Sequence, residues 1–146
     1  GASIPGTEHL VYLAAAMPDV GETMFDWVMK RPFEDATPLV FHDDGTCDLE
    51  IDWDDRRYDD ATTERIRATR LRPFAIAGIT TPITTAAWST LPSTYVVATR
   101  DTTIHPDTQR EMAQRAGQVL EVDAEHLVNL EHPAAVADLV AAVSST

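Results

Sequence analysis

The sequence has little of several residue types, and each shortage narrows the range of functions. Cys47 is the only cysteine, so a disulfide within the chain and a cluster of cysteines around a metal are both excluded. Lysine and arginine number 11 against 24 aspartates and glutamates, which gives a formal net charge of −13. A surface of this sign repels nucleic acids and anionic lipids. We therefore expect neither a nucleic-acid partner nor a membrane partner.

Long apolar runs are lacking as well. None approaches the roughly 20 residues that a helix needs to span a bilayer, and the chain does not open with the charged-then-apolar pattern of a secretory signal. Together with the single cysteine, this favours a reducing, cytoplasmic location. The 146 residues, 44% of them apolar, suffice for one compact domain with a substantial core.

Three short apolar runs have the length and the boundaries of strands buried on both faces of a parallel sheet. They are residues 9–15, 93–98 and 118–122. A helix is predicted after each of the last two runs. The sequence therefore reads strand, helix, strand, helix towards its end, which indicates an α/β fold with flanking helices.

Sequence signals set the limits of the two predicted helices. Pro106 suits the first turn of one helix and Gly117 its C-terminal cap. Pro133 begins the other. An apolar stripe at helical spacing follows, and we expect it to pack on the sheet; it consists of Val136, Leu139, Val140 and Val143.

Residues 19–90 do not continue this alternation. They predict a short helix over residues 22–30, a hairpin that turns at Asp43-Asp44-Gly45, and a helix over residues 61–71 capped by Asp60. Small elements of this kind, placed between core strands, are typical of an inserted cap.

The predicted organisation is a partial domain over residues 1–146. Its core is formed by residues 9–18 and 91–146, and residues 19–90 form the inserted cap. Acidic residues concentrate between positions 43 and 60, which we interpret as a solvated edge of that cap.

Asp101 and His126 are the strongest candidates for chemistry. Asp101 follows almost directly on the second strand, and His126 follows the third strand after a short loop. Because the carboxyl ends of neighbouring parallel strands lie at one edge of a sheet, the two side chains are placed to meet. A carboxylate that accepts the imidazole N–H fixes its tautomer, so that the histidine can act as a general base. Spacing alone leaves open an ordinary loop aspartate and a surface histidine.

Three segments, in this order and spacing, resemble one group of α/β-hydrolases: residues 9–18, residues 92–101 followed by Ile104 and Gln109-Arg110, and residues 121–126. The group includes plant methyl-ester esterases, hydroxynitrile lyases and bacterial esterase-like relatives. The first segment is similar to the strand after the nucleophile helix, the second to the acid-bearing segment, and the third to the histidine loop. The resemblance implies the C-terminal part of an α/β-hydrolase, with Asp101 as the acid and His126 as the base of a catalytic triad.

The nucleophile of such a triad is missing from the sequence. In this fold the serine precedes the acid and stands in a Gly-x-Ser-x-Gly turn between a strand and a helix. No such motif occurs, and Ser3, the nearest candidate, is separated from the strand at His9 by too few residues for that helix. We expect an N-terminal hydrolase half or a second chain to supply the serine. Three strands also leave a sheet edge open, which a homodimer could complete.

The resulting hypothesis is a carboxylic-ester hydrolase that acts on a small-molecule ester and needs no metal or organic cofactor. Met17 and Leu127 stand beside predicted strand ends and are predicted to line the substrate pocket. Two alternatives remain: a non-catalytic binding or assembly module, and a lyase of the same fold. Leu127 argues against the lyase, because the hydroxynitrile lyases of this group carry lysine directly after the histidine. The other histidines lack the spacing of a metal site; they are His9, His42, His105 and His132.

Overall fold

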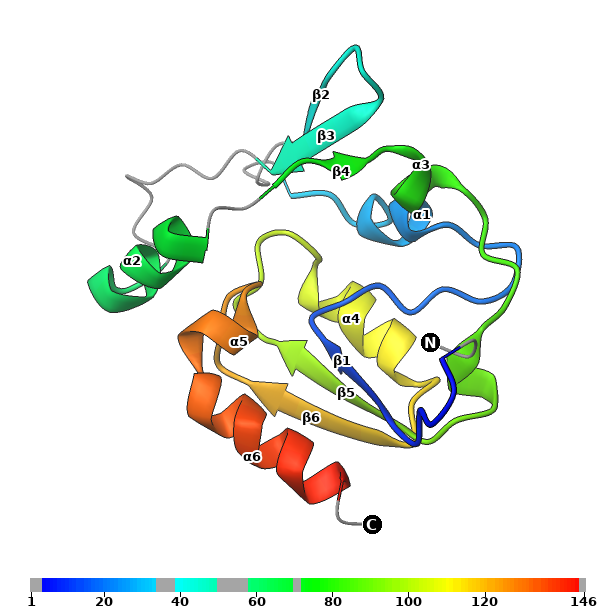
Figure 1. The fold of residues 1–146 in the computed structure, drawn as a ribbon, viewed down its shortest axis with the longest axis vertical. Coiled ribbons are helices and arrows are strands. Elements are labelled where there is room, and N and C mark those ends of the chain that lie inside the picture. The colour runs from blue at the N-terminus through cyan, green and yellow to red at the C-terminus, as the bar shows by residue number, and fades with distance from the viewer. Residues whose placement is uncertain (1–3, 34–38, 50–57, 70–71, 145–146) are drawn as a thin grey trace.

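The computed structural model describes residues 4–33, 39–49, 58–69 and 72–144, and its centre is a parallel sheet (Figure 1). The sheet has the order β1–β5–β6, formed by β1 (Leu10–Leu13), β5 (Ser93–Ala98) and β6 (Gln118–Val122). All three predicted strands are thus confirmed. β1 ends two residues before the predicted limit because Ala14 adopts a positive φ of 45°, which takes the backbone out of the extended conformation.

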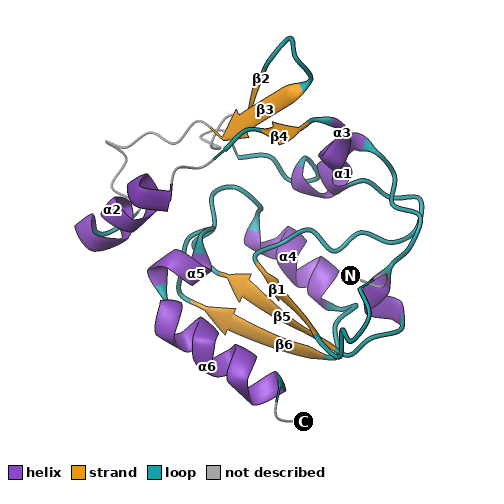
Figure 2. Ribbon diagram, in the orientation of Figure 1, coloured by secondary structure: helices purple, strands orange, loops and turns teal. Residues whose placement is uncertain are grey.

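Helices cover both faces of this sheet (Figure 2). They are α4 (Pro106–Ala113) on one face and α6 (Pro133–Val143) on the other. The alternation of side chains along β5 explains this arrangement, since successive residues point to opposite faces. Tyr95 and Val97 pack with residues of α4, whereas Val96 and Ala98 pack with residues of α6. The predicted α/β fold is therefore confirmed.

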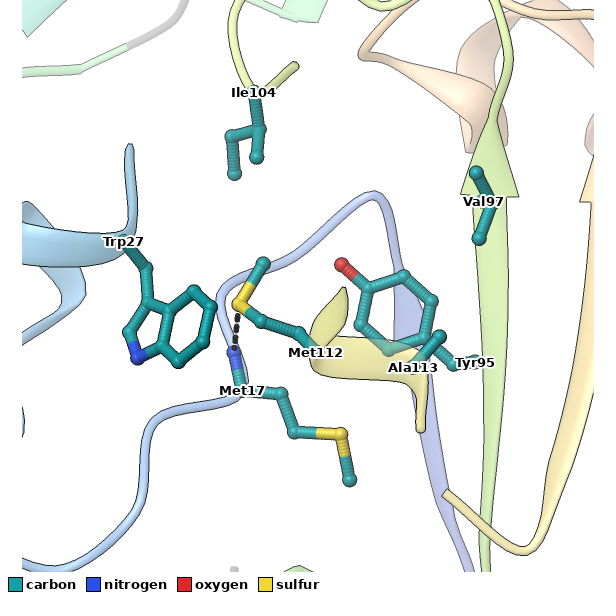
Figure 3. Packing of buried hydrophobic residues seen from close by; sticks show 7 residues of the cluster. All are labelled: Met17, Trp27, Tyr95, Val97, Ile104, Met112 and Ala113. Atoms are coloured by element: carbon teal, nitrogen blue, oxygen red, sulfur yellow. Dashed lines mark hydrogen bonds between the residues drawn. The ribbon is translucent and has the colours of Figure 1, made fainter. Parts of the chain in front are cut away.

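A cluster of buried apolar side chains joins the sheet, α4 and the segment that follows β1. Figure 3 shows its members, with Met112 of α4 near the centre and Tyr95 of β5 and Trp27 beside it. The backbone N–H of Met17 donates to the Met112 sulfur at 3.2 Å, which holds this segment against α4.

Most of the described elements between residues 19 and 90 lie on the side of the β5–α4 loop (Figure 1). The predicted hairpin is confirmed, since β2 and β3 pair antiparallel and Gly45 has the positive φ that such a turn favours. Both predicted helices are also present, although residues 70–71 of the second predicted helix lie outside the described residues. The elements are α1 (Met24–Val28), β2 (Leu39–Phe41), β3 (Thr46–Leu49), α2 (Asp60–Thr69), β4 (Phe74–Ala75), α3 (Ala77–Thr80) and η1 (Ala87–Ser89).

Two predicted helix caps are wrong. The side chain of Asp59, rather than Asp60, accepts the Thr62 N–H of α2 at 2.6 Å, and Asp60 is already the first helical residue. α4 ends at Ala113, so Gly117 lies too far along the chain to cap it. A Cβ at Gly117 would stand 3.4 Å from the carbonyl oxygen of Ser93, which is an ordinary contact distance.

The prediction that the third strand is buried on both faces is also wrong. Four of the five residues of β6 are exposed, among them Val119 at 46% and Leu120 at 38%. β6 lies at an edge of the sheet, and α6 covers it only in part, because Val136 and Leu139 pack inwards whereas Val140 is 46% exposed. This leaves an apolar surface near the sheet edge.

Polar contacts hold residues 19–28 against the segment that directly follows α4. The Arg115 guanidinium donates to both carboxylate oxygens of Glu22, at 2.8 and 3.1 Å, and to the Met17 carbonyl at 2.7 Å. The Trp27 indole donates to the same carboxylate at 2.7 Å. Hydrogen bonding from Arg115 lowers the pKa of Glu22 to about 2, so this carboxylate stays ionised at neutral pH.

None of the helices in the described ranges has the length and apolar character needed to cross a membrane.

Candidate active site

Asp101 follows β5 after a two-residue turn, and its side chain is almost completely buried at 1% exposure. One carboxylate oxygen, Oδ1, accepts the backbone N–H groups of Thr103 at 2.7 Å and Ile104 at 2.9 Å. These two bonds close the turn between β5 and α4 and fix the plane of the carboxylate. The second oxygen, Oδ2, is thereby turned towards the loop that follows β6.

His126 stands on that loop and meets Asp101. Its Nδ1 lies 2.8 Å from Oδ2 of Asp101, and its side chain is 22% exposed. An ionised carboxylate can only accept, so Nδ1 carries the proton and Nε2 of the neutral ring is the basic nitrogen. The structure thus brings together the two residues for which the sequence predicted a catalytic pairing.

Gln109 of α4 is a third polar residue beside Asp101 and His126, and it was not among the predicted site residues. It is fully buried, and its Nε2 donates to the same Asp101 Oδ2 at 2.7 Å. The spacing of Gln109 and Met112 is the signal that could have found it. Residues three apart share a helix face, so a glutamine at this position belongs to the buried side of α4.

The loop that carries His126 is stabilised by a cluster of charged residues next to α5 (Val128–Glu131). Glu125 is 5% exposed, its backbone N–H donates to Glu131 at 2.8 Å, and its carboxylate accepts from Thr102. Burial raises the pKa of Glu125. Arg100 donates to Asp123 at 2.8 Å and also to Glu131, so the turn after β5 is tied to the chain on both sides of His126.

Residues before α2 also contact this loop. The backbone N–H of Leu127 donates to the Tyr58 hydroxyl at 3.3 Å, and burial raises the pKa of that tyrosine to about 12. Arg65 of α2 donates to the Leu130 carbonyl at 2.8 Å. The histidine loop is therefore fixed from the side of residues 19–90 as well as from the sheet.

A cavity of about 340 Å³ lies beside His126, between the β5–α4 loop and the elements of residues 19–90. This volume falls in the usual range for small-molecule sites. Its described lining is apolar except for Thr103 and His126, and His126 carries the one ionisable side chain in it. Representative lining residues are Phe25 and Val28 of α1, Phe41 of β2, Phe74 of β4 and Ile104.

A family model for the alpha/beta hydrolase family matches residues 1–139. The chain belongs to the alpha/beta hydrolase family. The paired acid and histidine at two neighbouring strand ends therefore occur in the fold in which the order acid, then histidine is expected.

Solved structures of a hydrolase and an esterase have a similar fold. A pyrethroid hydrolase from Sphingobium faniae JZ-2 is 19% identical with a TM-score of 0.64; the match covers 94% of this chain and 61% of that one. Polyneuridine aldehyde esterase, in a mutant form, is 13% identical with a TM-score of 0.69, and 94% of this chain and 62% of that one are covered. The chain thus spans about three fifths of these neighbours. A search of curated proteins gave no match.

The two predicted pocket residues are not among the described residues that line the cavity. Met17 is fully buried in the apolar cluster of Figure 3, because its backbone N–H is held by the Met112 sulfur. Leu127 is the N-cap residue of α5, and its backbone faces the Tyr58 hydroxyl. Both stand near strand ends, as the sequence indicated, but neither is among the described residues that line this cavity.

The remaining histidines have local structural contacts. His105 is the N-cap of α4, where its Nδ1 accepts the Asp107 N–H at 3.1 Å, and its ring stacks on Phe33 at 4.9 Å. His42 pairs with Asp48 at 2.8 Å beside the hairpin turn. Ser3, the rejected nucleophile candidate, lies outside the described residues, as do positions 50–57 of the acidic stretch.

Proposed function

We propose that this chain is the C-terminal part of a carboxylic-ester hydrolase that acts on a small, apolar ester. Asp101 is the acid and His126 the general base of its triad, and the serine is supplied from outside residues 1–146. The observation that carries the proposal is the 2.8 Å contact between His126 Nδ1 and the buried Asp101 carboxylate, at the wall of an apolar cavity.

The proposed reaction follows from the state of the His126 ring. Nε2 takes the proton of the serine hydroxyl as its oxygen attacks the ester carbonyl, and Asp101 stabilises the imidazolium that forms. The imidazolium then gives this proton to the leaving alcohol, which leaves an acyl-enzyme. Water attacks the acyl group by the same route, with His126 again as the base, and releases the carboxylic acid and the serine.

The cavity indicates which part of the substrate these residues would hold. Its aromatic and aliphatic lining would bind an uncharged hydrocarbon group by burial of apolar surface. In this proposal residues 19–90 act as a cap, whose elements form one wall of the cavity, and residues 9–18 and 91–146 form the core. No residue of the described lining suits a charged substrate group apart from His126.

The partner that completes the site is an N-terminal hydrolase half, either on the same polypeptide or as a second chain. Its support is the open sheet. In the part of the chain that the structure describes, β1 pairs with β5 along one edge, and no strand pairs along its other edge. A further parallel strand there would bring its carboxyl end, where the nucleophile turn belongs in this fold, to the same edge as Asp101 and His126.

Hydrolysis of a graded series of esters by the complete protein tests the proposal. The complete protein is the product of the intact gene with every polypeptide that co-purifies. For p-nitrophenyl esters from acetate to octanoate we expect kcat/KM to rise with acyl length, by up to about fourfold per buried methylene, until the cavity is full.

A matched charged substrate sharpens this experiment. The p-nitrophenyl monoester of succinate has the length of the butyrate ester but ends in a carboxylate, and we expect a much lower kcat/KM because that charge would lose its hydration in the cavity. Failure of the complete protein to hydrolyse any of these esters would contradict the proposed function.

A further inference from the structure

Gln109 is buried where α4 passes behind the catalytic pair, and every hydrogen-bonding group of its amide has a partner. Nε2 donates to Asp101 Oδ2 at 2.7 Å and to the Ile104 carbonyl at 2.8 Å. Oε1 accepts the backbone N–H of Ala98, the last residue of β5, at 2.9 Å. The amide therefore connects the end of the strand, the turn and the acid.

These partners fix the orientation of the amide. Rotating it by 180° would place its oxygen against two acceptors, Asp101 Oδ2 and the Ile104 carbonyl, and its nitrogen against the Ala98 N–H. Each of these contacts would then be repulsive, and the buried amide would lose its partners. The glutamine consequently always presents an N–H to the carboxylate.

The Nε2 group of Gln109 and Nδ1 of His126 both donate to the same oxygen of Asp101. Asp101 Oδ1 accepts two backbone N–H groups, so Oδ2 is the oxygen available to side chains, and it accepts from both Gln109 and His126. Four donors thus surround one buried carboxylate. This number saturates its lone pairs and leaves one direction for the imidazole.

We propose that Gln109 is a positioning residue of the hydrolase, which holds the Asp101 carboxylate with Oδ2 aimed at His126 Nδ1. The inference rests on the proposed catalytic roles of Asp101 and His126. Gln109 itself does not line the cavity, so it acts on the reaction only through the acid.

Replacing Gln109 by a side chain of similar shape that has no hydrogen-bond donor tests the positioning role separately from packing. In Gln109→Met we expect kcat to fall about 10- to 100-fold, the usual effect of removing an outer partner of a site, with KM changed less than twofold. The matched control is Thr108→Val on the same helix. Thr108 is fully buried and its hydroxyl accepts from Arg31 at 3.0 Å, so the variant loses a side-chain hydrogen bond that does not reach Asp101.

A second variant separates positioning from packing by its dependence on pH. In Gln109→Glu the introduced carboxyl can donate to Asp101 while it is protonated, but repels that carboxylate once it ionises. The ratio of variant to wild-type kcat should therefore fall as pH rises. Gln114→Glu adds the same charge to the exposed end of α4, and its ratio should not change with pH.

The decisive readout does not depend on turnover. The proton between His126 Nδ1 and Asp101 gives a downfield proton resonance in the folded complete protein. We expect this resonance to shift or broaden in Gln109→Met and to remain at its wild-type position in Thr108→Val. If it stays in place in Gln109→Met, or if both variants lose kcat equally at matched thermal stability, the positioning role is refuted. An inactive wild-type protein would refute the proposed function instead, and the resonance would still test Gln109.

Discussion

His126→Ala is expected to reduce ester turnover by the complete protein by about 10⁵- to 10⁶-fold, as loss of a triad histidine does in serine hydrolases. The imidazole takes the proton from the nucleophile and later gives it to the leaving alcohol, so its removal affects both halves of the reaction. We expect KM to change little, because His126 forms one edge of the cavity and the apolar walls remain. Steady-state kinetics with p-nitrophenyl butyrate measures both constants.

The control for this variant is His132→Ala. His132 follows α5 in the same region, and its Nε2 bonds to the Asp123 carbonyl at 3.2 Å. The same deletion at this exposed position should leave kcat within about twofold of wild type, since surface changes rarely alter structure strongly. Near-wild-type kcat in His126→Ala would remove this residue from the mechanism.

Asp101→Asn is expected to lower kcat by about 10⁴-fold, the effect that this change has when it reverses the tautomer of a triad histidine. The hydrogen bonds of Asp101 explain why the reversal should occur here. The two backbone N–H groups on Oδ1 select the amide oxygen, which leaves the NH₂ group facing Gln109 and His126. His126 Nδ1 would then have to accept, and Nε2 would carry the proton and lose its function as a base.

The matched change is Asp123→Asn on the loop after β6. The side chain of Asp123 is 82% exposed and pairs with Arg100, so loss of its charge should cost little. A thermal melt of both variants separates catalytic loss from unfolding. Equal effects of the two substitutions on kcat would show that the buried aspartate has no special role.

The parts of the structure that could be predicted are those set by local patterns. The apolar runs identify β1, β5 and β6, and Asp43-Asp44-Gly45 identifies the hairpin turn. The pairing of Asp101 with His126 followed from one topological rule, because neighbouring parallel strands end at the same edge. These features depend on residues close in sequence or on the direction of the chain.

Features that depend on tertiary contacts could not be predicted in this way. The amide of Gln109 matters because the β5–α4 turn closes over it, and Met17 is directed inwards by a contact with Met112, far along the chain. The exposure of Val119 in β6 depends on what covers the sheet edge, which an apolar run cannot specify. Very short elements such as β4 give no periodicity to detect.

The central claim is that Asp101 and His126 serve a serine outside residues 1–146. Labelling of the complete protein with a fluorophosphonate, followed by denaturing intact-mass and peptide mass spectrometry, tests it most directly. We predict one adduct on a serine within a Gly-x-Ser-x-Gly sequence, on a polypeptide or segment other than residues 1–146. An adduct on a serine within residues 1–146, or ester hydrolysis by a protein that takes no label, would contradict the account.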